Sequence, residues 1–208
     1  MQRLLWGRAT SSNVMKVVWL LEEMQLPYER LDVGGAFGKT DTPEYRAMNP
    51  TGLVPTLQEG EFSLWESNAI LRYLCTAYGG DTPLFPAEPR ARGNVDRWMD
   101  CQQTQLNRPQ GIVFMNMVRT PPEQRDTAAL AQAVQEAGRV WAFLETPLSR
   151  HPFIAGDALS IADIAWGVHV HRWFTMAIDR PPAPHLRNWY DRLLQRPAYA
   201  AHMARPLA

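Results

Sequence analysis

Cysteine, lysine and net charge are all scarce in this chain of 208 residues. The two cysteines, Cys75 and Cys101, are too few for a disulfide scaffold and do not form a CxxC pair. We expect both to be free thiols in a reducing compartment. The 21 basic residues balance 21 acidic ones, so no positive surplus favours phosphate binding, and we expect no nucleic-acid partner.

Long hydrophobic runs are absent as well. No apolar stretch approaches the roughly 20 residues of a membrane span, and the opening MQRLLWGRAT lacks the apolar segment of a signal peptide. We therefore expect a cytoplasmic protein with no membrane partner. Lysine occurs only at Lys16 and Lys39, and the other basic residues are arginines, which indicates a compositional bias rather than a function.

Hydrophobic residues make up 46% of the chain and charged residues 20%, which is typical of a globular protein with a substantial core. Strand and helix patterns alternate in the first part of the chain. We expect a strand at 3–6, a helix at 13–25, a strand at 27–33, a loop with room for a short helix at 34–45, a hairpin at 53–65 that turns at 59–61, and a helix at 66–78. This order predicts a compact α/β unit of the form βαβ followed by ββα.

Glycine and proline interrupt the pattern at 79–93, and no strand pattern follows. We therefore place a first domain at 1–80, a linker at 81–92 and an all-α domain at 93–208. Helical segments are expected near 90–118, 123–147, 160–176 and 184–203.

A capping box is predicted at the start of the third of these helices. Ser160 and Asp163 have the required spacing, and Leu159 and Ile164 stand where a hydrophobic staple would place them. We interpret this Asp as a folding signal and not as a catalytic carboxylate.

Two short stretches, NPTGLVPTL (49–57) and WESNAI (65–70), are candidates for a binding site. Pro55 removes a hydrogen bond from an apparent strand, so the strand lies at an edge or bends there. A cis Val54–Pro55 bond would expose the main chain of Val54 to a ligand, but only about 5–6% of X–Pro bonds are cis, so the sequence alone does not select this form. Glu66 and Ser67 open a helix whose free N–H groups attract an anion such as a carboxylate.

Three polar residues, Ser11, Ser12 and Asn13, lie at the start of the first expected helix, which Asn13 heads. One cap is enough to start a helix. Taken alone, all three are interpreted as cap and loop residues.

Together these segments resemble the cytosolic glutathione transferase family. The strand–helix–strand opening, NPTGLVPTL, ESNAILRYL and SIADIAWG occur in the family's order and spacing over essentially the whole chain. The segments WGRATSSNVMKV, GLVPTL, LWESNAI and VRTPPEQRD further resemble a bacterial theta-like or beta-like subgroup. The resemblance implies a thioredoxin-like N-terminal domain, a C-terminal helical bundle, glutathione as co-substrate without a metal, and a homodimer.

The resemblance also assigns roles to individual residues. Val54 would pair its main chain with the cysteinyl part of glutathione, and Pro55 would be the cis proline. Glu66 and Ser67 would hold the γ-glutamyl end, with Glu66 on the ammonium group and Ser67 on the carboxylate.

Two further positions are assigned in the same way. Lys39 would face the glycyl carboxylate of glutathione. Leu53 stands where many family members carry Lys or Gln, so its contribution would be limited to its backbone.

The motif places a hydrogen-bond donor for the glutathione sulfur at Ser11, with Asn13, Ser12 or no side chain as alternatives. Lowering a thiol pKa from about 8.5 by two units requires roughly 2.7 kcal/mol. A hydrogen bond to the thiolate supplies about 1.5–3 kcal/mol and a helix N-terminus about 0.3–1 kcal/mol. One residue would donate to sulfur while another caps the helix.

The leading hypothesis is a glutathione transferase that activates the glutathione thiolate for attack on a small hydrophobic electrophile, as in detoxification. Two alternatives stay open. One is a glutathione-dependent disulfide or peroxide reductase, and the other is a non-catalytic protein that binds hydrophobic ligands on the same fold. The helical domain would select the electrophile, whose identity the sequence does not specify.

Overall fold

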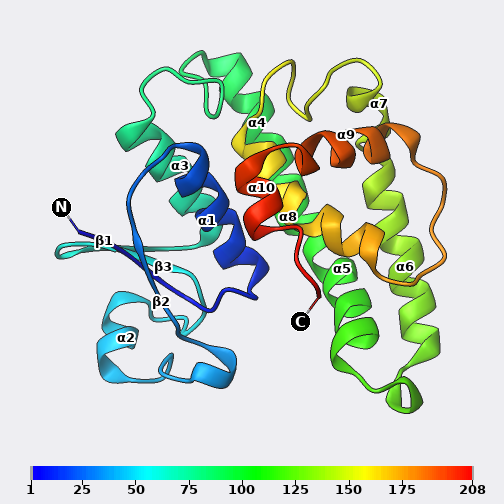
Figure 1. Ribbon diagram of the computed structural model, residues 1–208, viewed down its shortest axis with the longest axis horizontal. Coiled ribbons are helices and arrows are strands. Elements are labelled where there is room, and N and C mark those ends of the chain that lie inside the picture. Colours follow the sequence, from blue (N-terminus) through cyan, green and yellow to red (C-terminus); the bar gives the residue numbers. More distant parts are fainter. Residues whose placement is uncertain (1, 208) are drawn as a thin grey trace. The chain divides into compact units, whose positions relative to one another are not determined.

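A computed structural model describes residues 2–207, and the chain divides into two compact units after Gly80 (Figure 1). The first unit holds the strands β1 (Arg3–Trp6), β2 (Glu29–Leu31), β3 (Thr56–Glu59) and β4 (Phe62–Trp65), and the helices α1 (Ser12–Glu23), α2 (Pro43–Met48) and α3 (Ser67–Tyr78). The predicted α/β order is confirmed.

The sheet of the first unit has the strand order β2-β1-β3-β4. β1 runs parallel to β2 and antiparallel to β3, with Leu5 opposite Leu57. Both leucines are fully buried, as are Val17 of α1 and Ile70 of α3. Figure 1 shows α1 and α3 together on one side of the sheet and α2 on the other side.

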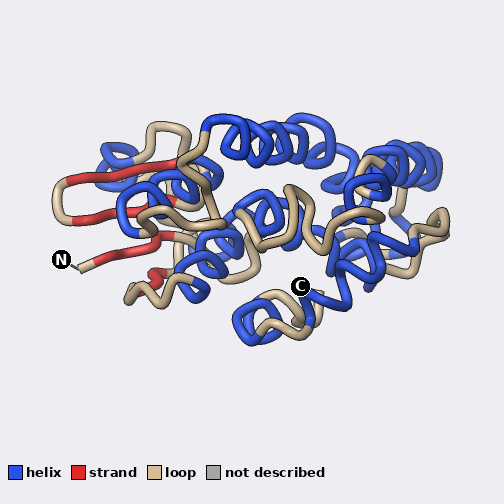
Figure 2. Tube along the Cα trace, turned by 90° about the horizontal axis from the view of Figure 1, so that it is seen from above, coloured by secondary structure: helices blue, strands red, loops and turns tan. Residues whose placement is uncertain are grey.

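The hairpin of β3 and β4 is shorter than the expected range 53–65 (Figure 2). The Val54–Pro55 peptide bond is cis, and β3 begins only at Thr56 because proline has no N–H group to donate to the sheet. The turn lies at Gly60 in the left-handed region, as the residues predicted.

A short helix, α2, occupies the end of the expected loop at 34–45. The Thr42 side chain accepts a hydrogen bond from the N–H of Tyr45 at 3.3 Å, and Pro43 takes the first helical position, where its missing N–H has no consequence. Local capping thus starts a helix in a segment with only a weak helical pattern.

The second unit is helical, which confirms the all-α prediction. Its elements are α4 (Pro89–Cys101), a π-turn (Gln102–Leu106), α5 (Asn107–Phe114), a second π-turn (Met115–Arg119), a 3-10 turn (Pro122–Gln124), α6 (Thr127–Ala142), α7 (Glu145–Leu148), α8 (Ile161–Thr175), α9 (Pro184–Leu194) and α10 (Pro197–His202). Between residues 81 and 207, β-structure is limited to two isolated bridges.

Some helix boundaries in this unit differ from those expected. α4 begins at Pro89, inside the range 81–92 assigned to a linker, because the Glu88 carboxylate accepts hydrogen bonds from the N–H groups of Arg90 and Ala91. The expected helix at 184–203 is divided in two, since Pro197 interrupts one helix and starts the next.

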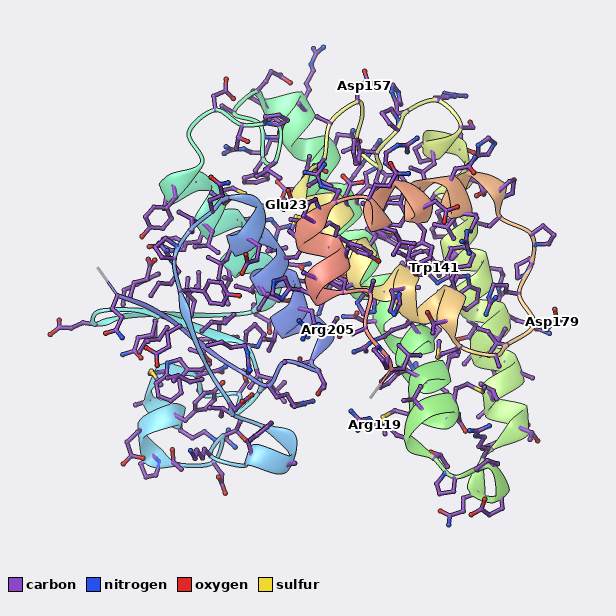
Figure 3. The ribbon with its side chains drawn as sticks, viewed as in Figure 1. Glu23, Arg119, Trp141, Asp157, Asp179 and Arg205 are labelled. Atoms are coloured by element: carbon purple, nitrogen blue, oxygen red, sulfur yellow. The ribbon has the colours of Figure 1, made fainter. Side chains whose placement is uncertain are left out.

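Trp141 lies in the interior of the helical unit, whereas Asp157 and Asp179 point outward (Figure 3). The indole N–H of Trp141 donates to the Gln110 side chain at 3.1 Å. The Trp141 ring packs against the Trp166 ring, with 5.4 Å between the ring centroids. The tryptophans of this unit therefore build its core.

The predicted capping box is present at the start of α8. The buried carboxylate of Asp163 accepts hydrogen bonds from the N–H and hydroxyl of Ser160, each at 2.9 Å, and also from the Ile154 N–H at 2.9 Å and the Trp189 indole at 3.0 Å. Burial raises the pKa of Asp163, and these four hydrogen bonds oppose the rise. Because these four donors are all protein groups in the interior of the helical unit, the Asp163 carboxylate is structural, as expected.

Candidate functional site

Gly7 marks the point where two parts of the candidate site meet. A Cβ atom placed on Gly7 would lie 2.4 Å from Val14 Cγ2 and 3.3 Å from Val54 Cβ. The first turn of α1 and the segment before the cis proline therefore approach each other across a residue that must lack a side chain.

The main chain of Val54 is open. Within residues 2–207, no hydrogen bond involves its N–H or its carbonyl group. Val54 stands directly before the cis Pro55, just ahead of β3, and its side chain is half-buried. An extended peptide that pairs with this residue would continue the sheet by main-chain hydrogen bonds.

Leu53 behaves differently, because both of its main-chain groups are hydrogen-bonded within the loop. Its carbonyl accepts hydrogen bonds from the Tyr45 hydroxyl at 2.7 Å and the Asn49 amide at 2.9 Å. Its N–H donates to the Thr51 hydroxyl at 3.2 Å. Leu53 is 67% exposed, so it presents an apolar side chain to a ligand or to solvent.

The three polar residues at the start of α1 are Ser11, which directly precedes the helix, and Ser12 and Asn13, which are its first two residues. Ser11 occupies the N-cap position, but its hydroxyl makes no capping hydrogen bond. No hydrogen bond of the Ser12 hydroxyl lies within the described chain, and the Asn13 Oδ1 atom is buried without a partner among those residues. The first turn of α1 therefore keeps unused N–H groups, and the Ser11 hydroxyl remains available to a ligand.

A second helix N-terminus lies at Glu66 and Ser67. Glu66 is exposed and adopts the left-handed conformation, with φ of 71°, which is unfavourable for a residue with a side chain. Its side chain does not cap α3. Ser67 is only 3% exposed and begins the helix. An anion bound here would meet free N–H groups and the positive end of the helix dipole.

Lys39 lies in an exposed loop, also with a positive φ of 68°. The Arg8 side chain lies against the same loop, because a Cβ on Gly35 would be 3.1 Å from Arg8 Cδ. The family resemblance assigns no role to Arg8. Its place next to the apolar run 3–6 was the available signal, since residues that follow a strand end lie at the edge of the sheet.

Lys16 is the functional candidate that sequence analysis missed. It lies on α1 and is fully buried, and its Nζ atom donates a hydrogen bond of 3.3 Å to Asn68 Oδ1 in the first turn of α3. Burial lowers the pKa of Lys16 to about 7, and the negative charge of Glu66 opposes this effect. The scarcity of lysine in the chain is a signal for Lys16, but the sequence alone favours a compositional interpretation of it.

Two kinds of site find no support in the part of the chain that the structure describes. Residues 2–207 contain no group of three or more His, Cys, Asp or Glu side chains placed to hold a metal ion. None of the described helices is both long and apolar enough to span a membrane.

The chain matches two family models. Residues 1–76 match the glutathione S-transferase N-terminal domain, and residues 127–192 match the glutathione S-transferase C-terminal domain. Glutathione S-transferase GstB of Escherichia coli strain K12 is 42% identical over 197 residues, which cover 93% of this chain and 94% of that protein.

Solved structures agree with these matches. The theta class glutathione S-transferase from Xanthomonas axonopodis pv. citri, crystallised with glutathione bound, aligns with a TM-score of 0.94 and 43% identity over 99% of both chains. A glutathione S-transferase from Pseudomonas fluorescens aligns with a TM-score of 0.84 and 28% identity over 95% of this chain and 97% of that one. A sheet domain and a helical domain that each match the corresponding family model, with close relatives along nearly the whole length, make this chain a member of the glutathione S-transferase family.

Proposed function

We propose that the chain acts as a glutathione transferase that docks glutathione along Val54 and between the first turns of α1 and α3. The observation that carries this proposal concerns Val54, which directly precedes the cis Pro55. Its main-chain N–H and carbonyl have no hydrogen-bond partner within residues 2–207. The cysteinyl residue of glutathione pairs there as a short added strand.

The two ends of glutathione find complementary charges. The γ-glutamyl carboxylate sits at the N-terminus of α3 and the Ser67 hydroxyl, and its ammonium group pairs with Glu66. Lys39 and the neighbouring Arg8 supply positive charge for the glycyl carboxylate. Leu53 adds apolar contact alone, because both of its main-chain groups are used within the loop.

Ser11 donates its hydroxyl hydrogen to the glutathione sulfur. Because this hydroxyl makes no capping bond, the donation disrupts nothing in α1. A hydrogen bond to a charged acceptor contributes about 1.5–3 kcal/mol, and the helix N-terminus contributes about 0.3–1 kcal/mol. The sum is sufficient to lower the thiol pKa by about two units, so that most bound glutathione is thiolate near neutral pH. Ser12 and Asn13 are the alternative donors.

The thiolate then attacks an electrophilic carbon of a small hydrophobic substrate. A carbon–sulfur bond forms, and a leaving group such as halide departs with its electron pair, or an activated alkene takes up a proton. Such conjugation makes a reactive compound more soluble, which suits detoxification in the cytoplasm, where Cys75 and Cys101 stay reduced.

We also propose that two copies of the chain associate. Phe62 and Tyr78 are 45% and 43% exposed, and both belong to an aromatic cluster with Tyr73 on β4 and α3. Exposed aromatic clusters are typical of protein interfaces. Sedimentation of wild-type protein and of Phe62→Ser tests this, with a dimer expected for the first and a shift toward monomer for the second; a monomeric wild type contradicts the proposal.

Calorimetric titration with glutathione, followed by ultraviolet difference spectroscopy of the bound thiol, tests the main proposal. We expect saturable binding and thiolate absorbance at neutral pH. Assays with an activated aryl halide and with a small disulfide then separate conjugation from reduction. Binding without ionisation favours the non-catalytic alternative, and faster reduction of the disulfide favours the reductase.

A further inference from the structure

A fully buried lysine contacts α3 one residue beyond Ser67, in the proposed γ-glutamyl site. Lys16 is fully buried on α1, and Nζ donates to Asn68 Oδ1, one residue beyond Ser67 on α3. Asn68 is itself only 8% exposed. The contact therefore joins the two helices whose N-termini form the site.

The identity of this cation matters because the chain otherwise uses arginine almost throughout. Lys16 and Lys39 are its only lysines. A guanidinium group stays charged at all ordinary pH values, whereas a buried lysine can lose its proton. The preference of this chain for arginine over lysine is thus broken at a buried position, where lysine and arginine differ in their ability to lose a proton.

Glu66, the N-cap residue of α3, is a charged group that acts on Lys16. Asn68 of α3, which accepts the hydrogen bond from Nζ, is neutral. On α1 itself, the residues one turn away are Ser12, Asn13, Trp19 and Leu20, none of which is charged. Burial lowers the pKa of Lys16 to about 7, so a negative charge placed nearby would raise the protonated fraction of Lys16 near neutral pH.

We propose that Lys16 is a positioning residue of the γ-glutamyl site, which holds the first turn of α3 through Asn68 and takes up one proton from solvent when the glutathione carboxylate binds. The lone pair on Nζ accepts this proton, and the resulting ammonium group balances the carboxylate charge. This inference rests on the proposed function, since it requires glutathione to bind at α3.

The inference predicts a specific signature. Ionisation of the glutathione thiol releases a proton, whereas Lys16 takes one up, so a ligand without a thiol isolates the second event. S-methylglutathione is such a ligand. Its titration into the full chain by calorimetry, in two buffers with different ionisation enthalpies, gives the number of protons bound on complex formation.

For the wild type near pH 7.5, we expect uptake of about half a proton or more per site. For Lys16→Met, uptake falls to near zero and the KM for glutathione rises about tenfold or more, while kcat at saturating glutathione changes less than threefold, because Lys16 does not touch the sulfur. Arg150→Met is the matched control: it removes an exposed basic residue outside the proposed site and retains proton uptake. Equal uptake by wild type and Lys16→Met would overturn the inference.

A second variant covers the case in which methionine is not tolerated. Lys16→Arg retains the charge but cannot exchange its proton, so we expect binding without uptake and a KM that varies little between about pH 6.5 and 8.5. Wild-type protein that binds S-methylglutathione with no proton uptake would refute the inference alone. Wild-type protein that binds neither S-methylglutathione nor glutathione would refute the proposed function, and this inference with it.

Discussion

The Tyr45 hydroxyl on α2 donates a 2.7 Å hydrogen bond to the carbonyl of Leu53, two residues before the cis proline. The oxygen of Tyr45 also lies 2.9 Å from the Thr56 hydroxyl, and the Asn49 amide donates both to that hydroxyl and to the Leu53 carbonyl. These bonds fix the chain on both sides of Val54. The open main chain of Val54 is therefore held between Leu53 and Thr56, which are both hydrogen-bonded to Tyr45 and Asn49.

Removal of the Tyr45 hydroxyl should loosen this segment. For Tyr45→Phe, we expect about 1–2 kcal/mol lower free energy of unfolding, since the Leu53 carbonyl and the Thr56 hydroxyl each lose a partner. The KM for glutathione should rise several-fold with kcat nearly constant. Urea unfolding and steady-state kinetics measure both quantities. Tyr28→Phe, which removes an exposed hydroxyl that bonds Glu22, is the control and should change neither.

Ser11→Ala should reduce turnover by about 10–100-fold, the scale of one lost hydrogen bond to a thiolate. Its stability should stay within about 0.5 kcal/mol of wild type, because the hydroxyl makes no capping bond. Ser12→Ala serves as the matched variant, and we expect less than a threefold effect on turnover. The opposite ranking of the two variants would transfer the role to Ser12, and no effect of either would transfer it to Asn13.

Glu59 should control the response of the first unit to acid. Burial alone would raise its pKa, but hydrogen bonds from Tyr73 at 2.6 Å, Tyr78 at 2.9 Å and Arg3 at 2.7 Å lower it below the ordinary value. Because the folded pKa is the lower one, this carboxylate stabilises the fold above about pH 4.5, and the contribution disappears as the pH falls through the folded pKa.

Glu59→Gln should therefore lose about 2 kcal/mol at neutral pH and show a flatter acid limb of stability against pH. Thermal unfolding between about pH 3 and 7 measures this. Glu61 is exposed and lies two residues further along, in the same turn, so Glu61→Gln should retain the wild-type dependence of stability on acid pH. An unchanged limb in Glu59→Gln would show that the titration lies elsewhere.

Asp163 should be among the residues whose loss is most damaging to the helical unit. In Asp163→Ala, four donors from Ile154, Ser160 and Trp189 lose their acceptor in a buried position. We expect about 3–5 kcal/mol lower free energy of unfolding, measured with urea. The exposed Asp157, whose carboxylate pairs with the solvent-accessible His151 side chain, offers the control, and Asp157→Asn should lie within about 0.5 kcal/mol of wild type.

Lys16 should also change stability with pH. Its pKa is lower in the folded chain, about 7, than the ordinary 10.5, so between these values the unfolded state binds more protons than the folded state. Wild-type stability relative to Lys16→Met should therefore rise by about 2–3 kcal/mol between about pH 7 and pH 9. Below about pH 7, the burial cost of the charge is fully present and Lys16→Met should have its largest advantage. Parallel unfolding curves across this range would contradict the assignment.

Much of the fold was predictable from local patterns. The apolar stripe of α1, the turn at Gly60 and the capping box at Ser160 each involve residues within a few positions of one another, and the structure contains all three. The starts of α4 and α10 were predicted less accurately, because each depends on one residue that periodicity does not register. Glu88 caps α4 with two hydrogen bonds, and Pro197 starts α10.

The sequence by itself determined the order of elements, the all-helical second unit and the candidate segments around Ser11, Val54 and Ser67. The elements and the segments around Val54 and Ser67 follow from side-chain spacing and from residue types that suit caps, turns and strands, whereas the place of Ser11 in the site follows from the resemblance to the family. Only the tertiary structure decided that Leu53 uses its own backbone groups, that Ser11 does not cap α1, and that Lys16 is buried against Asn68. Those facts depend on contacts between segments up to 52 residues apart, and the free energy of a buried charge depends on what surrounds it in space.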